Sequence, residues 1–528
     1  MELAPDVKKL ALEYQRWHNS IQVKENIPTI VVDEVVAKVA SFYEKIRGIV
    51  DWREEHLLRK TAIERILKRR MLLGPEKDFA EPFLQELIRG GHFPNEHIPI
   101  AKIEEIQKTV EKYLYLLKHS SQTGTEKVLA QLRMWLLSIA ASEIEEALAP
   151  PIRERALIEF MAQDMEERIR LQESINITSE EKSLQISVAV QRALFKLDEA
   201  TITHHLLEKK YPDWNAPSSE TLQQLAAKLP ETKNELHKIF HHPLAERLYQ
   251  LVEKYDSPYL IIGDILTDHP GEFEQFSQDA ASMESAVQEN YKTRLEKLKG
   301  KMQRAAIYST ISVFLTKVLL AFSIEIPLDK YIIGDFNLTT LWIGVIVPPL
   351  LMLLLVLSTK TTTKENFQKL MMAVMKITYG KENGGVLEIP VIKRRRPMIE
   401  KSINTIYLLS FLLSFGIISW LLWQVNFSVL SIIIFLAFIS MIAFAGTKIR
   451  QRSRELLVGE ERQGFIYTIF DLFSLPIIHT GGWLSHQVAR YNILSVILNF
   501  LIEVPFQVFI EFLEQWRSFL REKREKVH

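Results

Sequence analysis

The sequence predicts an all-α protein in which a large helical cytoplasmic N-terminal domain is followed by a polytopic α-helical membrane domain. Before residue 300, apolar residues recur at three- and four-residue spacing, with Pro and Gly between the segments. After residue 304, the apolar residues gather in runs of membrane-spanning length. The chain of 528 residues is also too long for one hydrophobic core, which favours at least two structural units.

Composition narrows the class of protein further. The net charge is zero, so the chain as a whole gives no reason to expect nucleic acid as a partner. The absence of cysteine excludes disulfides, thiolate metal sites and cysteine nucleophiles. The first thirty residues are charged and mixed, with no apolar core of signal-peptide length, so the N-terminal domain is expected in the cytoplasm. We expect a multi-pass protein of a bacterial-type inner (plasma) membrane with both termini cytoplasmic.

Residues 1–280 form the expected helical domain, in which no strand alternation is evident. A basic juxtamembrane stalk helix is expected at 281–304, as the end of the last helix of this half. The expected helices of this half are 6–24, 32–48, 51–72, 78–90, 101–118, 124–148, 152–174, 180–209, 218–240, 243–255 and 272–302.

The expected membrane domain covers residues 305–447 and holds four spans, joined in the middle by a basic cytoplasmic loop at 359–402. The spans are 305–324, 338–358, 404–423 and 427–446. The second span contains Pro348-Pro349, which predicts a kink. Lys and Arg flank the cytoplasmic ends: the loop holds ten basic residues against four acidic ones, whereas Glu325, Asp329 and Asp335 dominate the link between the first two spans.

The first span is the marginal one because Lys317 lies near its centre. Its ten Leu, Ile, Val and Phe residues contribute about −3 to −6 kcal/mol to insertion, and the lysine costs about 2.5–3.5 kcal/mol. The sum favours insertion of residues 305–324. The alternative is a helix that lies in the interface with Lys317 towards water.

The C-terminal segment 465–528 is expected to form an amphipathic or re-entrant helical hairpin with a basic tail. Residues 465–478 are too short to span, and His479-Thr480-Gly481-Gly482-Trp483 is expected to break the helix. Residues 492–513 follow with fifteen Leu, Ile, Val and Phe residues. A hairpin returns the basic end to the cytoplasm, and a fifth span is the alternative.

Polar residues recur every four positions in this last segment. They are Ser495, Asn499, Glu503, Gln507 and Glu511. On a helix these residues share one face. Such a face is typical of a polar intramembrane track, with Glu503 as an ion site and Lys317 as its partner. It is also typical of an interfacial helix whose polar stripe is exposed to water. The second interpretation is favoured because Pro505 and the flanking charges suit an interface.

Three basic or histidine-rich clusters remain. Lys393, Arg394, Arg395 and Arg396 beside the membrane predict contact with anionic lipid headgroups, although a topology signal explains them equally well. The basic helix 51–72 is expected to be a solvated surface helix, and nucleic-acid binding is disfavoured because no aromatic residues are interleaved. Histidines cluster at His204-His205 and at His237, His241 and His242; solvated or capping roles are favoured, and no metal site is predicted.

No catalytic, cofactor-binding or phosphate-binding motif is present in the sequence. The favoured function is therefore a membrane-anchored scaffold or interaction protein whose cytoplasmic domain binds a protein partner. The alternative is a transporter or channel component that uses the polar track and Lys317. Four spans make a small permeation unit, so this alternative implies a homo-oligomer. An intramembrane or lipid-modifying enzyme ranks last, since no nucleophile or metal site supports it.

Overall fold

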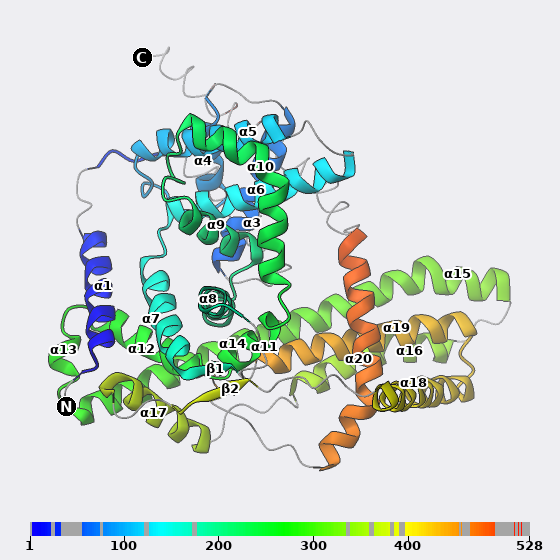
Figure 1. Cartoon of the computed structure of the whole chain (residues 1–528). Coiled ribbons are helices and arrows are strands. Elements are labelled where there is room, and N and C mark those ends of the chain that lie inside the picture. The colour runs from blue at the N-terminus through cyan, green and yellow to red at the C-terminus, as the bar shows by residue number, and fades with distance from the viewer. Residues whose placement is uncertain are drawn as a thin grey trace. The chain divides into compact units, whose positions relative to one another are not determined.

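The computed structural model is built almost entirely of helices (Figure 1). It describes residues 3–22, 27–32, 55–73, 78–120, 126–171, 177–333, 338–357, 364–380, 385–389, 397–452, 456, 465–491, 512, 516 and 519. The chain divides into two compact units. Unit 1 comprises Met1–Val287, Met371–Pro390 and Phe506–His528, and unit 2 comprises Gln288–Leu370 and Val391–Pro505.

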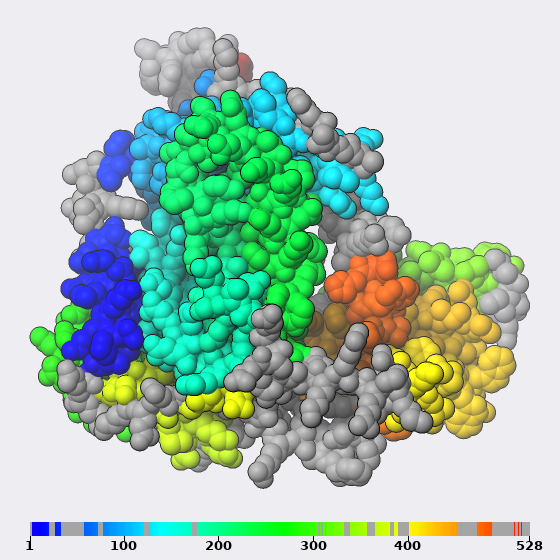
Figure 2. Space-filling model, in the orientation of Figure 1, coloured from blue at the N-terminus to red at the C-terminus, as the bar shows by residue number. Residues whose placement is uncertain are grey.

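Thirteen elements precede residue 280 in the described part of the chain, and all belong to unit 1. They are α1 (Pro5–Gln22), α3 (Glu55–Leu73), α4 (Ala80–Arg89), α5 (Ala101–Ser120), α6 (Glu126–Leu148), α7 (Ile152–Arg168), β1 (Ile169–Leu171), α8 (Ser179–Phe195), α9 (Glu199–Lys210), α10 (Ser219–Phe240), α11 (Ala245–Glu253), α12 (Ser257–Asp268) and α13 (Phe273–Phe276). Figure 2 shows the cyan, teal and green helices of this unit packed into one continuous surface on the face in view.

The elements from residue 280 onwards include the apolar helices. They are α14 (Ala280–Leu320), η1 (Ala321–Glu325), α15 (Ile326–Leu328), η2 (Asp329–Ile333), α16 (Leu338–Leu357), α17 (Lys364–Tyr379), β2 (Leu387–Ile389), α18 (Pro397–Gln424), α19 (Val429–Arg452) and α20 (Phe465–Tyr491). The elements η1 and η2 are π-helical turns. The region 359–402, expected as a loop, thus contains a complete helix, a short strand and the beginning of α18.

Unit 1 has its own hydrophobic core, formed mainly by α3 to α6, α9 and α10. Helix α4 shows why these residues form a helix: Phe83, Leu84, Leu87 and Ile88 are all buried and recur at the spacing of one helical face. The prediction of an all-α fold is confirmed, with one exception. Strands β1 and β2 form a parallel pair of three residues each, with Ile169 opposite Leu387, and such short strands show no alternation in sequence.

The helix expected at 180–209 is two helices, so that prediction is wrong. Lys196 adopts a left-handed conformation with φ 53° and ends α8. Asp198 then caps α9, and its Oδ1 accepts a hydrogen bond of 3.0 Å from the backbone N–H of Thr201. The change of direction lets α9 pack against α6. The sequence pattern does not predict helix α12, because its apolar, mostly buried surface shows no amphipathic period.

Three helices of the described chain are long and apolar enough to cross a membrane. The windows are Leu338–Leu355, Lys401–Gln424 and Val429–Gln451, and they correspond to the second, third and fourth expected spans. Helix α18 carries large apolar side chains on its exposed surface, which suits contact with lipid. They include Leu408, Leu409, Leu412, Leu413 and Trp420.

The first expected span, 305–324, is not among these three helices. Stalk and span form one continuous helix, α14, which continues through the two π-helical turns to Ile333. Glu325 and Asp329, which the sequence placed in a loop between spans, are therefore helical. Whether residues 305–324 span a membrane stays a prediction.

Helix α20 runs unbroken through His479–Trp483, so the predicted break is wrong. Figure 1 shows this helix, in orange and red, crossing steeply over α19. Pro476 lacks an N–H and leaves the carbonyl of Leu472 without its helical donor. The hydroxyl of Ser410 on α18 donates to that carbonyl at 2.6 Å, and Ser414 donates to the carbonyl of Phe473 at 2.8 Å. The neighbouring helix thus stabilises the carbonyl that the proline leaves unpaired and also bonds the one after it.

The Gly481-Gly482 pair lies where α20 meets α19. A Cβ at Gly481 would overlap the carbonyl oxygen of Ser440, and one at Gly482 would lie 3.1 Å from the ring of Phe444. These glycines therefore serve close helix packing, as small residues do in membrane bundles, and do not act as helix breakers.

Candidate functional site

Lys317 is the only residue of the predicted intramembrane site that the structure describes. Asn499, Glu503 and Gln507 lie outside the described residues, as do Ser495 and Glu511 of the same stripe. Lys393, Arg394, Arg395 and Arg396, the predicted lipid contact, lie outside them too. The pairing of Lys317 with Glu503 and the contact with anionic lipid therefore stay predictions.

Lys317 forms a buried ion pair with Glu325, eight residues further along the chain. Its Nζ donates to Glu325 Oε1, and the two side chains are 1% and 5% exposed. The ammonium also lies 5.5 Å from the ring centroid of Phe438. A Cβ built at Gly344 would lie 3.7 Å from Lys317 Cε, so a small residue on α16 makes room for the lysine stem. Unit 2 thus holds two opposite charges within an apolar helical packing.

A second polar site lies in the core of unit 1, around Glu143 on α6. Its carboxylate accepts hydrogen bonds from Lys112 Nζ at 2.5 Å, Tyr113 Oη at 2.8 Å and Trp214 Nε1 at 2.9 Å. Lys112 also donates to the backbone carbonyl of Trp214 at 2.9 Å. We call Lys112, Tyr113, Glu143 and Trp214 the Glu143 network; it joins α5, α6 and the loop before α10.

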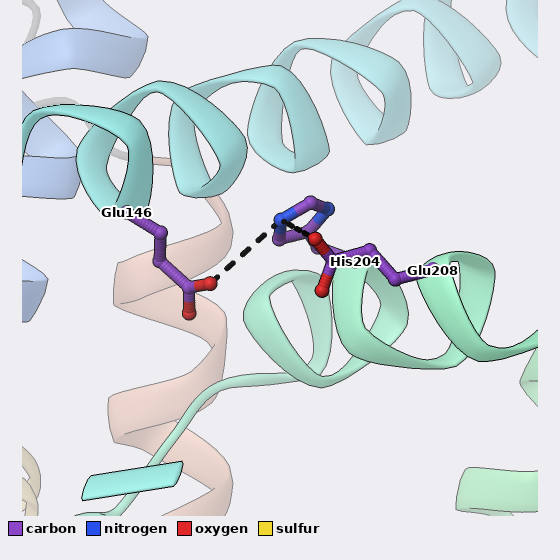
Figure 3. Close-up of side chains that lie close together, drawn as sticks. All are labelled: Glu146, His204 and Glu208. Atoms are coloured by element: carbon purple, nitrogen blue, oxygen red, sulfur yellow. Dashed lines mark ion pairs between the residues drawn. The ribbon is translucent and has the colours of Figure 1, made fainter. Parts of the chain in front are cut away.

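A group of metal-ligand type lies next to this network and is formed by Glu146 on α6 and by His204 and Glu208 on α9. We call these three residues the His204 cluster; their ligand atoms all lie within 4.8 Å of one another. His204 Nε2 lies 3.7 Å from Glu146 Oε2 and 3.5 Å from Glu208 Oε1. Figure 3 shows the three side chains pointing toward one another from the two helices.

Helical spacing explains why these residues meet. Glu143 and Glu146 are three residues apart on α6, and His204 and Glu208 are four apart on α9, so each pair shares one helix face. The turn at Lys196 and the Asp198 cap direct that face of α9 towards α6. The packed helices therefore bring two carboxylates and an imidazole to one point.

Two neighbouring side chains orient the His204 cluster. His205 Nε2 lies 2.6 Å from Glu146 Oε1, and its Nδ1 lies 2.7 Å from Gln191 Oε1. Arg155 Nη2 donates to Glu146 Oε2 and, at 2.8 Å, to Glu208 Oε2. A single guanidinium thus bridges the two carboxylates from the α7 side.

The surroundings of the cluster set its protonation. Burial lowers the pKa of His204 to about 3, so the imidazole is neutral at neutral pH. Burial acts to raise the pKa of Glu146, but the hydrogen bond from His205 and the nearby cations outweigh it and lower that pKa to about 2. Glu145, on the same helix, faces Arg59 instead, and burial raises its pKa to about 7. A neutral imidazole and an ionised carboxylate therefore coexist at neutral pH.

A cavity of about 600 Å³ lies between α7, α8 and α9 and reaches this cluster. Its lining includes Arg155, Gln191, His205 and Glu208. Small molecules and ions in the cavity can therefore approach the carboxylate of Glu208 directly.

The solvated or capping role expected of the His204-His205 pair is wrong for His204, which is 2% exposed, and the sequence pattern does not connect the pair with α6. The available signal was the run Glu143-Ile144-Glu145-Glu146, three acidic residues in a stretch of α6 that is buried throughout. The other histidine pair, His237 and His241, stacks its rings at 3.9 Å on α10 and its C-cap, with His241 Nδ1 3.0 Å from the carbonyl of His237. That pair lies on the exposed surface, as expected.

The basic helix α3 differs from the expected solvated helix. Lys60 is 4% exposed and pairs with Asp198, the residue that caps α9. Arg59 pairs with Glu145, and Arg69 and Arg70 pair with Glu86. These cations therefore serve the packing of unit 1.

Acid unfolding of unit 1 follows from these three pKa values. Between pH 6.5 and 3 the unfolded chain protonates His204 and the folded chain does not, so stability falls as pH falls. Glu145 acts in the opposite direction between pH 7 and 4.5, because the folded chain binds its proton first. Below pH 4.5 Glu146 also lowers stability as pH falls, because the unfolded chain protonates this carboxyl and the folded chain does not. We expect the contribution of these three groups to stability to stay nearly level from pH 6.5 to 4.5 and then to fall by about 2.7 kcal/mol per pH unit, the effect of two protons.

Denaturant unfolding of the full chain in detergent, measured in steps from pH 7 to 3.5, checks this profile. The variant Glu145→Gln removes the opposing carboxyl, so its stability is expected to begin falling near pH 6.5, by about 1.4 kcal/mol per pH unit. A variant with the same profile as the parent chain would contradict the assignment.

The comparisons with known proteins leave function to be argued from this geometry. No family model, no curated protein and no solved structure matches the chain. The observations that remain are the three apolar helices, the buried Lys317–Glu325 pair and the His204 cluster with its cavity.

Proposed function

We propose that this chain is a membrane-anchored interaction protein, with unit 2 as the anchor and unit 1 as the part that binds a protein partner. The observation that carries the proposal is the exposed apolar surface of α18, where most of a helix of spanning length faces outward. Unit 1 supports the proposal because it has a hydrophobic core of its own and is a compact unit separate from unit 2, which holds the apolar helices. In this proposal both termini are cytoplasmic, in a bacterial-type inner membrane, and the basic residues 393–396 contact anionic lipid.

Cysteine-accessibility mapping tests the anchor, because the chain contains no cysteine of its own. Single cysteines replace exposed residues: Val128 on α6, Tyr331 on η2, Met372 on α17 and Val425 between α18 and α19. A membrane-impermeant maleimide applied to intact cells is expected to label positions 331 and 425 and to spare 128 and 372 until the cells are opened. Labelling of all four positions, or of none after opening, contradicts a multi-pass anchor with this orientation.

Affinity purification of the tagged full chain from detergent tests the interaction. A partner is expected to copurify at a stoichiometric level and to be absent when an unrelated tagged membrane protein is purified in the same way. Repeated purifications without such a partner count against an interaction protein.

The second candidate is a transporter or channel component, and the buried Lys317–Glu325 pair favours it. Charged residues at membrane depth are costly and commonly mark ion or substrate pathways, and π-helical turns are frequent at functional sites. Ion flux in liposomes is measured for the parent chain, for the double variant Lys317→Met/Glu325→Gln and for Lys330→Met, which removes an exposed cation of the same segment. Flux lost only in the double variant supports transport, and equal flux in all three removes this candidate.

A further inference from the structure

The imidazole of His204, in the His204 cluster, is not satisfied by hydrogen bonds among the described residues. His204 is 2% exposed, and its Nδ1 has no hydrogen-bond partner in the part of the chain that the structure describes. Its Nε2 lies 3.5 Å and 3.7 Å from the two nearest carboxylate oxygens, longer than the 2.7–3.2 Å of an ordinary hydrogen bond. A buried polar group without partners is rare and calls for an explanation.

The spacing of the three metal-ligand atoms explains why Nε2 makes no short hydrogen bond to either carboxylate. Metal bonds of about 2.0–2.2 Å to nitrogen and oxygen place neighbouring ligand atoms about 3.0–3.6 Å apart around one ion. The two distances from His204 Nε2, 3.5 Å and 3.7 Å, lie close to that range. The imidazole nitrogen therefore lies near ligand-to-ligand distance from both carboxylates, and all three ligand atoms lie within 4.8 Å of one another.

An outer layer of contacts completes the arrangement. When Nε2 binds a metal, Nδ1 carries the proton, and Glu143 Oε2 lies 3.9 Å from that nitrogen, beyond hydrogen-bond distance. The same oxygen is held by Tyr113 and Trp214. His205 orients Glu146 from the other side. Contacts to a ligating side chain, such as that of His205 with Glu146, orient ligands and tune affinity.

Arg155 is the cation with which a metal ion competes. Its guanidinium bridges Glu146 and Glu208, and its side chain is 43% exposed towards the cavity that borders Glu208. An arginine that is partly in solvent can move aside, and the cavity leaves a path for an ion together with room for water or a small ligand in the remaining coordination positions.

We infer that Glu146, His204 and Glu208 bind one divalent first-row transition metal ion in unit 1. One imidazole and two carboxylates favour Zn²⁺, Mn²⁺ or Fe²⁺ over Ca²⁺ and Mg²⁺, which prefer sites built of oxygen alone. The site is independent of the proposed interaction function.

The test is metal binding to the full chain in detergent, after treatment with a chelator and its removal. Titration with Zn²⁺ by calorimetry and with Mn²⁺ by electron paramagnetic resonance is expected to show one site per chain. Glu208→Gln and His204→Gln each remove a ligand and are expected to weaken binding by at least about 100-fold, and His205→Gln by about 10- to 100-fold. Arg155→Gln removes the competing charge and is expected to tighten binding by roughly tenfold.

His241→Gln is the matched control, since it removes an exposed histidine from a surface pair. Its binding is expected to equal that of the parent chain. The thermal unfolding temperature with and without Zn²⁺ gives a second readout: the metal is expected to raise it in the parent chain and in Arg155→Gln but not in Glu208→Gln. Parent-like binding by Glu208→Gln and His204→Gln overturns the inference, and so does binding that only His241→Gln reduces. Arg155→Gln retains all three ligands, so it remains informative if His204→Gln does not fold. Weaker binding by Arg155→Gln than by the parent chain also overturns the inference.

Discussion

Replacing Glu143 by Gln is expected to lower the free energy of unfolding of unit 1 by about 3–5 kcal/mol, because it leaves a buried cation without its counter-charge. Glu143 and Lys112 are 4% and 5% exposed. A Gln side chain also presents an amide N–H₂ to a site that receives hydrogen bonds from a lysine, a tyrosine and a tryptophan. At least one donor then faces another donor, which adds the cost of an unsatisfied buried group.

The double variant Lys112→Met/Glu143→Gln separates the two costs. It removes the unpaired charge and is expected to recover a large part of the loss, since buried pairs can be replaced by apolar groups with little net change. Glu145→Gln is the matched control: it lies two residues away on α6, is 7% exposed, and its carboxyl has a pKa of about 7. At pH 6, where this carboxyl is largely protonated, the control is expected to lose much less. Equal losses in Glu143→Gln and Glu145→Gln, measured by denaturant unfolding at pH 6, would contradict the role given to the Glu143 network.

Replacing Lys317 by Met is expected to destabilise unit 2 by about 3–5 kcal/mol, because Glu325 is then a buried carboxylate without a partner. Both side chains are almost fully buried, and the lysine also contacts the ring of Phe438. Glu325→Gln leaves the ammonium unpaired instead and is expected to have a similar effect. Unfolding of the purified chain by increasing denaturing detergent measures both losses.

The double variant Lys317→Met/Glu325→Gln is expected to be more stable than either single variant. The difference between the double variant and the sum of the single ones is the coupling energy of the pair. Lys330→Met, at an exposed position of η2, is the control and is expected to change stability by less than about 0.5 kcal/mol. Additive effects of the two single changes would show that Lys317 and Glu325 do not act as a pair in the folded protein.

Hydropathy predicted the apolar helices well because their signal is local. Residues 338–357 are almost wholly apolar, and no arrangement of neighbours is needed to predict a helix of spanning length there. The amphipathic helices of unit 1 were predicted for the same reason, since α4 and α11 show a buried face in their own spacing. The polar residues near 499–507 lie outside the described residues, so the polar track stays a prediction.

Helix ends were predicted less well because breaks depend on neighbours. Pro476 and Gly481-Gly482 look like a break in sequence, yet α18 stabilises the freed carbonyl of Leu472, and α19 needs the glycines for close packing. Conversely, residues 180–209 look like one helix, and the Asp198 cap divides them. In each case a contact from outside the local segment, or a capping side chain within it, outweighed the intrinsic preference.

The sequence by itself determined that this protein is helical, that its apolar helices gather in the second half, and that cysteine chemistry is absent. Only the tertiary structure decided which charges meet. Glu143 and Glu146 are about 60 residues from His204, and no periodic pattern relates α6 to α9. Periodicity shows which face of a helix is apolar and which is polar. The pairing of buried charges depends instead on which helices pack together, and the fit of their side chains in the core decides that.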